Sequence, residues 1–485
     1  MSFLPRRSIS LIRALAHQRN RFEALAPAGA SVVSRAGHIL AAFVLAGTFV
    51  LAGTFALSAP AAAFAEVLES DEIGNKTVAA RGLSADACPD IGATHAILVG
   101  SDGTVYFSRD VNAEVKIASL TKIMTAVVAL ENAPLDLTVT VDNEAATVGE
   151  SSAGLLEGDT MSLETALYAL LVPSGNDAGI AIAKSVGAHM SGDASTGYDT
   201  FIAAMNAKAA DLGMSHSVYT NPHGLDFDAF GDEDLHSSAR DVATLVSYAM
   251  QNDTFRGIVD AGSTTITVAS ADGTARNVAL QTTDELMGVY DGICGVKTGT
   301  TDDAGYCFAG AVSRDAGELY SVVLDSPSSD ERFSDTVALM DWAYANIAQR
   351  SLVNSDQYVE YLGAHVPLVA KVAHNDWVDV AVDATVADPD LAANVFAAFG
   401  PVQAKATFNE LSGDVHAGDV IGSLVFMQDD NQIAQTNIIA AEDVAAPNFF
   451  QGIGVGFDRW IRSIQHQPTV AETQECYYTQ ALSDR

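Results

Sequence analysis

The sequence predicts an α/β (α+β) sandwich, in which one antiparallel sheet is flanked by helices and followed by a smaller β-rich domain. Strand-like patterns occur on both sides of a long helical region, so the terminal elements of that region are expected to join one sheet. After about Ser351 the helical periodicity fades and an alternating pattern begins. The chain of 485 residues also exceeds the usual size of one hydrophobic core, which favours two folded units.

The N-terminal segment, residues 1–65, is basic and then apolar. Its arginines precede an apolar stretch at residues 39–57, and Ala63-Phe64-Ala65 fits the small-residue motif that signal peptidase cuts. A cleaved signal peptide is one interpretation. An uncleaved signal anchor is the other, because the apolar stretch is long enough to span a bilayer. Both predict an exported, extracytoplasmic protein, at the outer face of the cytoplasmic membrane or in the cell wall.

The formal net charge is −36, and it becomes more negative without residues 1–65. That segment holds six of the 25 Lys and Arg and one of the 61 Asp and Glu, which leaves 19 minus 60, or −41. A surface this acidic repels a phosphate backbone, so nucleic acid is excluded as a natural partner. It gains nothing from anionic lipid headgroups either. The acidity therefore predicts a solvated exterior.

The first folded unit is expected at residues 88–350, after a polar and flexible lead-in at residues 66–87. It opens with two strand-like runs around the turn signal Ser101-Asp102-Gly103. Helical patterns, in which apolar residues repeat at spacings of three and four, then dominate until strands return. The predicted elements are strands at 93–100 and 105–108, helices at 117–130, 163–171, 198–212 and 238–250, strands within 293–327, and a helix at 330–348.

The second unit, residues 351–447, alternates in the manner of half-buried strands. Residues 448–485 follow as a helix with one apolar face and then a polar tail. Bulky apolar residues on one face, with arginines elsewhere, suit a helix that lies on a membrane surface. The alternative is a closing helix packed on the β-rich domain. A peripheral membrane contact through this helix is thus one of two expectations.

The chain has four cysteines, without Cys-x-x-Cys spacing or a nearby set of histidines, so zinc is not expected and no cofactor is predicted. Disulfides are permitted in an exported protein, and four cysteines allow three pairings. Cys294 and Cys307 fall on two neighbouring predicted strands, which favours a bridge between them. Buried free thiols are the alternative. The remaining two are Cys88 and Cys476.

One short motif suggests a nucleophile. Ser119-Leu120-Thr121-Lys122 is the only Ser-x-x-Lys in the chain, and its spacing places both polar side chains on one face of a helix. A lysine that is kept neutral beside a serine can accept the hydroxyl proton and so activate the serine. The ordinary alternative is that Ser119 caps the helix and Lys122 is solvated.

Two further motifs follow, on a loop and on a strand. Ser174-Gly175-Asn176 lies between two helical stretches and by itself indicates only a loop. Lys297-Thr298-Gly299 is the only Lys-Thr-Gly in the chain, and it ends a strand. A cation and a hydroxyl beside an exposed strand suit a peptide that ends in a carboxylate.

The three motifs, in this order on helix, loop and strand, form the set found in penicillin-binding proteins and class A β-lactamases. Over residues 88–350 the sequence resembles the low-molecular-weight penicillin-binding proteins, the serine-type D-alanyl-D-alanine carboxypeptidase family. Longer segments, such as Asn221-Pro222-His223-Gly224-Leu225, also resemble sequences of this family. The resemblance implies a serine β-lactamase/transpeptidase-like catalytic domain. Residues 412–422 resemble, more loosely, the β domain that follows it in this family.

The resemblance implies a reaction: removal of the terminal D-alanine from peptidoglycan stem pentapeptides through an acyl-enzyme on Ser119. Lys122 is the implied general base. Ser174 would relay a proton to the departing D-alanine, and Asn176 would hold the substrate amide. β-Lactam antibiotics are the implied covalent inhibitors, because they acylate the same serine.

The resemblance also implies how the substrate is bound. Lys297 and Thr298 would bind its terminal carboxylate, with Gly299 in the same strand. The backbone amides of Ser119 and Thr300 would form the oxyanion hole. Arg332 stands where the family often places a second carboxylate-binding arginine, with a surface salt bridge as the alternative.

Three other functions compete with this interpretation. A β-lactamase shares the acylation chemistry but needs a further base for deacylation, and no Glu-x-x-Leu-Asn occurs between Ser174 and Lys297. A D,D-endopeptidase uses identical chemistry in a different groove. A non-catalytic wall-binding protein would have a decayed site, whereas every motif residue is intact here.

Overall fold

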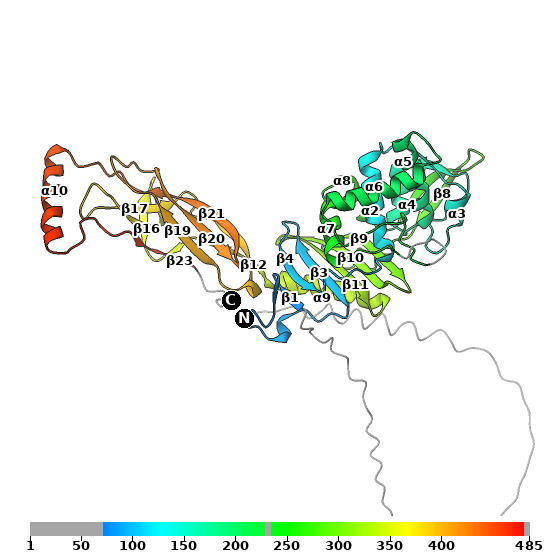
Figure 1. Cartoon of the computed structure of the whole chain (residues 1–485), viewed down its shortest axis with the longest axis horizontal. Coiled ribbons are helices and arrows are strands. Elements are labelled where there is room, and N and C mark those ends of the chain that lie inside the picture. Colours follow the sequence, from blue (N-terminus) through cyan, green and yellow to red (C-terminus); the bar gives the residue numbers. More distant parts are fainter. Residues whose placement is uncertain (1–70, 228–233, 480–485) are drawn as a thin grey trace, which may run out of the picture. The chain divides into compact units, whose positions relative to one another are not determined.

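The computed structural model describes residues 71–227 and 234–479, and Figure 1 shows the chain coloured along its sequence. The expected signal peptide or signal anchor, residues 1–65, lies outside the described residues. In the described part, no helix combines the length and the apolar character that crossing a bilayer requires.

A seven-stranded antiparallel sheet forms the centre of the first domain in the described part of the chain. Its order is β2-β1-β4-β3-β11-β10-β9, so strands from the two ends of the domain meet where β3 pairs with β11. The prediction that the terminal elements join one sheet is therefore confirmed. The strands are β1 (Asp71–Ile73), β2 (Lys76–Thr77), β3 (His95–Gly100), β4 (Val105–Arg109), β9 (Ile293–Thr301), β10 (Gly305–Arg314) and β11 (Gly317–Ser326).

The expected flexible lead-in at residues 66–87 is wrong from Asp71 onward. β1 pairs with β4, and Ile73 is fully buried. Asp71 is buried as well and forms an ion pair with Arg109, with Oδ1 and Nε 2.6 Å apart. A three-residue strand that is held by a buried ion pair shows no periodic apolar pattern, which is why the sequence did not predict it.

The two faces of this sheet carry separate cores, because side chains alternate along each strand. Val322 and Val323, neighbours in β11, belong to different cores. Helix α7 (Ala239–Ala249) packs against β3 and β11, and α9 (Ser329–Asn346) packs against β10 and β11 from the opposite face (Figure 1). The predicted arrangement of an antiparallel sheet flanked by helices is confirmed.

The helical region between β4 and β9 holds most of the predicted helices. Three helices of the domain begin at a serine whose hydroxyl accepts a backbone amide hydrogen bond, namely Ser162, Ser238 and Ser328. Helix α5 and the four-stranded sheet β5-β6-β7-β8 were not predicted as such. The elements are α2 (Thr121–Asn132), α3 (Asn143–Thr147), α4 (Leu163–Leu171), α5 (Asn176–Ser191), α6 (Gly197–Asp211), α8 (Asp253–Val259), β5 (Thr138–Thr140), β6 (Thr160–Ser162), β7 (Thr264–Ala269) and β8 (Ala275–Leu280).

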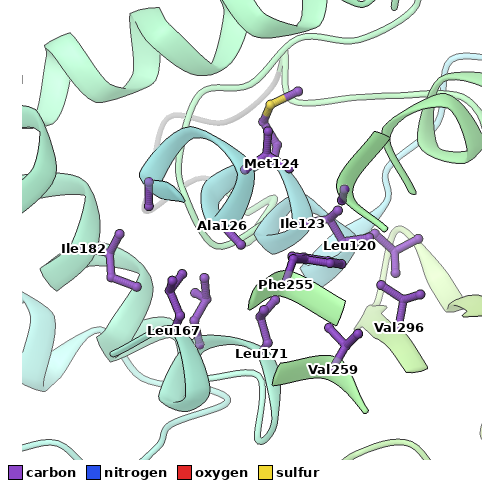
Figure 2. Close-up of a cluster of buried hydrophobic side chains, with 14 of the residues drawn as sticks. Leu120, Ile123, Met124, Ala126, Leu167, Leu171, Ile182, Phe255, Val259 and Val296 are labelled. Atoms are coloured by element: carbon purple, nitrogen blue, oxygen red, sulfur yellow. The ribbon is translucent and has the colours of Figure 1, made fainter. Parts of the chain in front are cut away.

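Helix α2 runs through the larger core. Figure 2 shows Ile123 and Ala126 of α2 among apolar side chains of the surrounding helices, including Leu167, Ile182 and Phe255. A helix that is buried on all sides cannot shift without opening the core. The start of α2, which carries the Ser-x-x-Lys motif, is therefore held in a fixed position.

The β-rich domain contains a six-stranded antiparallel sheet of order β19-β20-β21-β17-β16-β22 in the described part. Its core includes Val372, Leu424 and Ile438. Shorter two-stranded pairings, β12-β18, β13-β23 and β14-β15, complete the domain. The strands are β12 (Ile347–Ser351), β13 (Asn354–Ser355), β14 (Tyr358–Tyr361), β15 (Ala364–Pro367), β16 (Ala370–Ala373), β17 (Ala381–Val386), β18 (Ala392–Phe396), β19 (Gln403–Phe408), β20 (Val420–Gln428), β21 (Asn431–Ala440), β22 (Gln474–Glu475) and β23 (Tyr477–Tyr478).

The predicted C-terminal helix is present as α10 (Phe449–Ile464), drawn in red in Figure 1. The segment after it is not simply a polar tail, however. β22 pairs with β16, and β23 pairs with β13, so the chain returns to the β-rich domain after the helix. These strands are two residues long, too short for any sequence pattern to indicate them.

The cysteines form no disulfide in the structure, so the expected Cys294–Cys307 bridge is wrong. Cys307 lies opposite Gly299 in the β9–β10 pair. The thiol of Cys294 lies near the start of β9, within 3.5 Å of the carbonyl oxygen of Ala311. The two residues occupy neighbouring strands, as predicted, but the register separates them along those strands.

Candidate active site

Ser119 and Lys122 lie together where α2 begins. Ser119 belongs to a short 3-10 turn, Ala118–Leu120, and Lys122 lies in the first turn of α2. Lys122 Nζ is 2.8 Å from Ser119 Oγ and 2.7 Å from Asn176 Oδ1, and it donates to the carbonyl oxygen of His223 at 2.8 Å. Lys122 has no exposed surface. The alternative of a solvated Lys122 is therefore wrong.

The surroundings of Lys122 favour its neutral form. Burial, and then the positive charge of Lys297, hold the pKa of Lys122 well below its ordinary value, while the Asp177 carboxylate acts in the opposite direction. A neutral amine has a free lone pair. Across the same 2.8 Å contact, the Ser119 hydroxyl can then donate its proton to Nζ.

The Ser-x-Asn motif connects α4 to α5. Asn176 is the first residue of α5; its side-chain amide donates to the carbonyl oxygen of Gly149 at 3.1 Å. Ser174 is 4% exposed and has a positive φ of 65°. Among the hydrogen bonds of the described residues, none links the Ser174 hydroxyl to Ser119 or Lys122. The structure thus brings Asn176 into contact with Lys122 and places Ser174 in the adjoining loop.

Asp177 is a supporting residue that the sequence reasoning did not identify. Its carboxylate accepts hydrogen bonds from the Ser152 hydroxyl at 2.6 Å and from the amides of Ala153 and Leu155, each at 3.0 Å. These bonds fix the loop before β6 against the start of α5. Its position directly after Ser-Gly-Asn was the only signal available in the sequence.

The Lys-Thr-Gly motif lies in β9, at its C-terminal end. Lys297 is 1% exposed and donates to the carbonyl oxygen of Thr298 at 3.0 Å. Burial and then the charge of Arg332 lower the pKa of Lys297 to about 7, and Asp284 opposes this shift. The hydroxyl of Thr298 shares a 2.7 Å hydrogen bond with that of Thr283, a second supporting residue that the sequence did not reveal.

Arg332 projects from α9 to the same strand. Its Nη1 donates to Thr300 Oγ1 at 2.9 Å and to the carbonyl oxygen of Gly299 at 3.2 Å. The side chain is largely buried, and no ion pair joins it to an acid among the described residues. The alternative of a surface salt bridge is therefore wrong, and the structure places Arg332 beside the predicted substrate-binding strand.

Two glycines allow other backbone segments to approach Ser119. A Cβ atom at Gly299 would lie 2.8 Å from the carbonyl oxygen of Ile117 and 3.3 Å from the amide nitrogen of Ser119. At Gly224, where φ is +90°, a Cβ atom would lie 1.9 Å from the carbonyl oxygen of Ala118. Close packing around the serine therefore requires glycine at both positions.

Replacing Gly224 with alanine is expected to lower the melting temperature by about 5 °C or more, because backbone strain and overpacking each cost about 1–3 kcal/mol. The displaced Ala118 would also slow acylation of Ser119. Gly273→Ala is the matched control, since Gly273 has φ +82° but nothing lies within 4 Å of the place that a Cβ atom would take there. Equal losses in the two variants, measured by thermal unfolding and penicillin labelling, would contradict this account.

A cleft of about 680 Å³ opens at Ser119. Asn176 and Thr300 line it as well, so the turn before α2, the start of α5 and β9 share one cavity. No cluster of three or more possible metal ligands occurs in the described ranges. A serine that lines this cleft and contacts a buried lysine defines a serine hydrolase that works through an acyl-enzyme.

Comparison with known proteins identifies the family. The family model described as D-alanyl-D-alanine carboxypeptidase, Peptidase S11, matches residues 82–328. The chain belongs to this family of serine-type peptidases. Its motif residues Ser119, Lys122, Ser174, Asn176 and Lys297 all lie within the matched segment.

Relatives and solved structures agree with this assignment. The D-alanyl-D-alanine carboxypeptidase of Streptomyces sp. (strain K15) is 32% identical over 250 residues, which cover 50% of this chain and 84% of that protein. DacF of Bacillus subtilis, also named a D-alanyl-D-alanine carboxypeptidase, is 25% identical over 365 residues, 74% of this chain and 87% of DacF. The crystal structure of the Streptomyces K15 DD-transpeptidase matches with a TM-score of 0.50 and 30% identity, covering 53% of this chain and 98% of that one. Some matching relatives are named endopeptidases instead.

Proposed function

We propose that this protein removes the terminal D-alanine from peptidoglycan stem pentapeptides through an acyl-enzyme on Ser119, and that β-lactams acylate the same residue. The observation that carries the proposal is the contact between the Ser119 hydroxyl and a fully buried Lys122 at the mouth of a cleft. A lysine in this state is a base at neutral pH, which an exposed lysine is not.

The proposed reaction begins when Ser119 Oγ attacks the carbonyl carbon of the penultimate D-alanine and its proton passes to Lys122 Nζ. The peptide C–N bond then breaks. The departing D-alanine takes this proton from Lys122 through the Ser174 hydroxyl, so Lys122 is neutral again and the peptide remains as an ester on Ser119. Lys122 then takes a proton from a water molecule that attacks the ester, the bond to Ser119 Oγ breaks, and Lys122 returns the proton to Oγ.

The proposed substrate binding uses the residues of β9, with Arg332 of α9 beside that strand. Lys297, Thr298 and Arg332 bind the terminal carboxylate of the substrate, and the Asn176 amide holds the peptide bond that precedes the cleaved one. The backbone amides of Ser119 and Thr300 stabilise the negative oxygen that forms during attack. Gly299 supports this arrangement, because the absence of a side chain there keeps β9 close to the Ser119 amide.

Mass spectrometry of the mature protein with a pentapeptide ending in D-Ala-D-Ala tests the proposal, together with a parallel sample treated with penicillin. We expect loss of one D-alanine and a penicilloyl adduct on the peptide that contains Ser119. An unchanged peptide without an adduct would favour a wall-binding protein. Cleavage of cross-linked dimers in preference to pentapeptides would favour an endopeptidase, and rapid repeated hydrolysis of nitrocefin would favour a β-lactamase.

We also propose that the protein is exported and that α10 contacts a membrane surface. The apolar face of α10 is open: Phe449, Phe450 and Trp460 are 79%, 82% and 60% exposed. Its arginines point the other way. Arg459 donates to the carbonyl oxygen of Trp377, and Arg462 donates to the carboxylate of Asp379. The polar face of α10 thus contacts the β-rich domain. The apolar face points away from that domain and is exposed, so it can contact lipid.

Replacing Phe457 and Trp460 together with serine is expected to weaken binding to phosphatidylcholine vesicles by about tenfold or more, because each buried aromatic ring contributes about 1.5–3 kcal/mol. Co-sedimentation of the protein with vesicles measures this. Val289→Ser is the control, since Val289 is 80% exposed and lies outside α10. Equal sedimentation of both variants and the original protein would contradict a lipid contact through α10.

A further inference from the structure

Asp284 is a buried acid that the reaction described above does not use. It lies in the loop between β8 and β9 and is 7% exposed. One carboxylate oxygen, Oδ1, accepts a hydrogen bond from the amide of Leu286 at 2.9 Å. The other, Oδ2, is buried without a hydrogen-bond partner. A buried acceptor in this state costs about 1–3 kcal/mol, so its presence needs an explanation.

The loop that holds Asp284 is fixed against the substrate-binding strand. Thr283, the preceding residue, shares its 2.7 Å hydrogen bond with Thr298, and its amide donates to the carbonyl oxygen of Val172 at 3.3 Å. Asp284 therefore cannot move away from Lys297 without breaking contacts to both β9 and the end of α4.

Arg332 of α9 is the cation whose charge acts on Lys297. The charge of Lys297 in turn helps to lower the pKa of Lys122 and so favours its neutral form. Asp284 is the acid that acts on Lys297 within the described residues. Its neighbour Glu285 is exposed and acts on Arg332 instead. In turn, burial raises the pKa of Asp284 to about 6, while Lys297 and Arg332 oppose that shift.

A purely structural role would not require the charge of Asp284. The hydrogen bond from the Leu286 amide to Oδ1 could be accepted equally well by the side-chain oxygen of asparagine. What asparagine lacks is a negative charge beside two buried cations. Attraction to these cations offsets the cost of burying the carboxylate.

We propose that Asp284 is a positioning residue for carboxylate recognition, whose negative charge keeps Lys297 protonated when the substrate's terminal carboxylate arrives. This inference rests on the proposed function, in which Lys297 binds that carboxylate. Asp284 does not touch the substrate; it acts through Lys297.

The pH dependence follows from the two groups. Above about pH 6 Asp284 is ionised and supports the charged form of Lys297, whose pKa is about 7. Without that negative charge the pKa of Lys297 falls, so a smaller fraction of the enzyme carries the cation at pH 8. At pH 5.5 most of Asp284 is itself protonated, so the original enzyme largely lacks the same negative charge and the difference shrinks.

Asp284→Asn tests the proposal, with kcat and KM for the D-Ala-D-Ala pentapeptide measured from pH 5.5 to pH 8.5. We expect kcat/KM at pH 8 to fall about five- to tenfold, mainly through a higher KM, and to converge with the original enzyme at pH 5.5. Glu285→Gln removes a neighbouring exposed carboxylate and should leave the profile unchanged. Thermal unfolding checks that both variants fold.

A loss in Asp284→Asn that is the same at every pH, or that falls on kcat alone, would overturn the proposal and indicate a structural role. An unchanged profile would overturn it as well. The original enzyme is assayed first. If it does not cleave the pentapeptide, the proposed function is wrong, and this outcome is distinguished from a failure of the Asp284 proposal because no variant has yet been compared.

Discussion

Replacing Ser119 with alanine is expected to abolish the penicilloyl adduct and to lower the rate of D-alanine release by at least about 10⁴-fold, as loss of the nucleophile does in other serine hydrolases. No other hydroxyl contacts Lys122 in the described structure, so no second residue can take over the attack. Mass spectrometry of the penicillin-treated variant and a discontinuous assay of released D-alanine measure the two effects.

The Ser119→Ala variant should remain folded, because the Ser119 side chain makes one hydrogen bond and is partly exposed. An unchanged melting temperature, together with retained binding of the uncleaved pentapeptide, provides the control. Release of D-alanine within tenfold of the original rate would mean that another residue forms the acyl-enzyme.

Lys122→Arg is expected to lower the acylation rate by about 10³- to 10⁴-fold, because it replaces an amine that can be neutral with a guanidinium that stays charged. Removing a general base typically costs about 10²- to 10⁴-fold, and a guanidinium cannot lose its proton in this pH range. The larger guanidinium must also fit where Lys122 Nζ contacts Asn176 and the carbonyl oxygen of His223. Stopped-flow acylation by a fluorescent penicillin measures the rate.

Lys184→Arg is the matched control for this variant. Lys184 is partly exposed and pairs with the carboxylates of Asp142 and Glu144, which an arginine can also do. We expect its acylation rate to be unchanged. If Lys122→Arg acylates at a comparable rate, Lys122 acts as a fixed charge rather than as a base, and the proton must leave Ser119 by another route.

The contact between Ser119 and Lys122 could be predicted from their short spacing, whereas their roles as nucleophile and base were predicted from the set of three motifs and the family resemblance. Ser119 and Lys122 are three residues apart, and helical geometry alone brings them together. The contact of Lys122 with Asn176 could be anticipated only from the family resemblance. The two residues are far apart in the chain, and the packing of α5 against α2 brings them together.

Helix α5 was not predicted because its sequence contains glycines that usually weaken a helix. The structure explains Gly187. A Cβ atom there would lie 1.8 Å from the carbonyl oxygen of Gly197 at the start of α6. The glycine allows the two helices to pack closely. Tertiary packing thus requires glycine at a helical position where helix propensity disfavours it.

The supporting acids could not be predicted for a similar reason. Asp177 and Asp284 are two of many acidic residues in a strongly acidic chain, and apart from the place of Asp177 directly after Ser-Gly-Asn nothing in their local sequence separates them from solvated ones. Only burial and neighbouring cations do so. The prediction of a Cys294–Cys307 bridge was wrong because the register of neighbouring strands cannot be determined from the sequence.

The return of the chain after α10 gives the last residues a protective role. β22 covers the outer edge of β16, where Glu475 lies opposite Ala370, and the Thr473 hydroxyl accepts a hydrogen bond from the amide of Ala373. A protein shortened before Thr473 would expose the backbone groups of β16 as an open edge, which is a template for pairing with another molecule. Shortening the chain between α10 and Thr473 therefore keeps the helix and its apolar face, and adds an open sheet edge that favours aggregation.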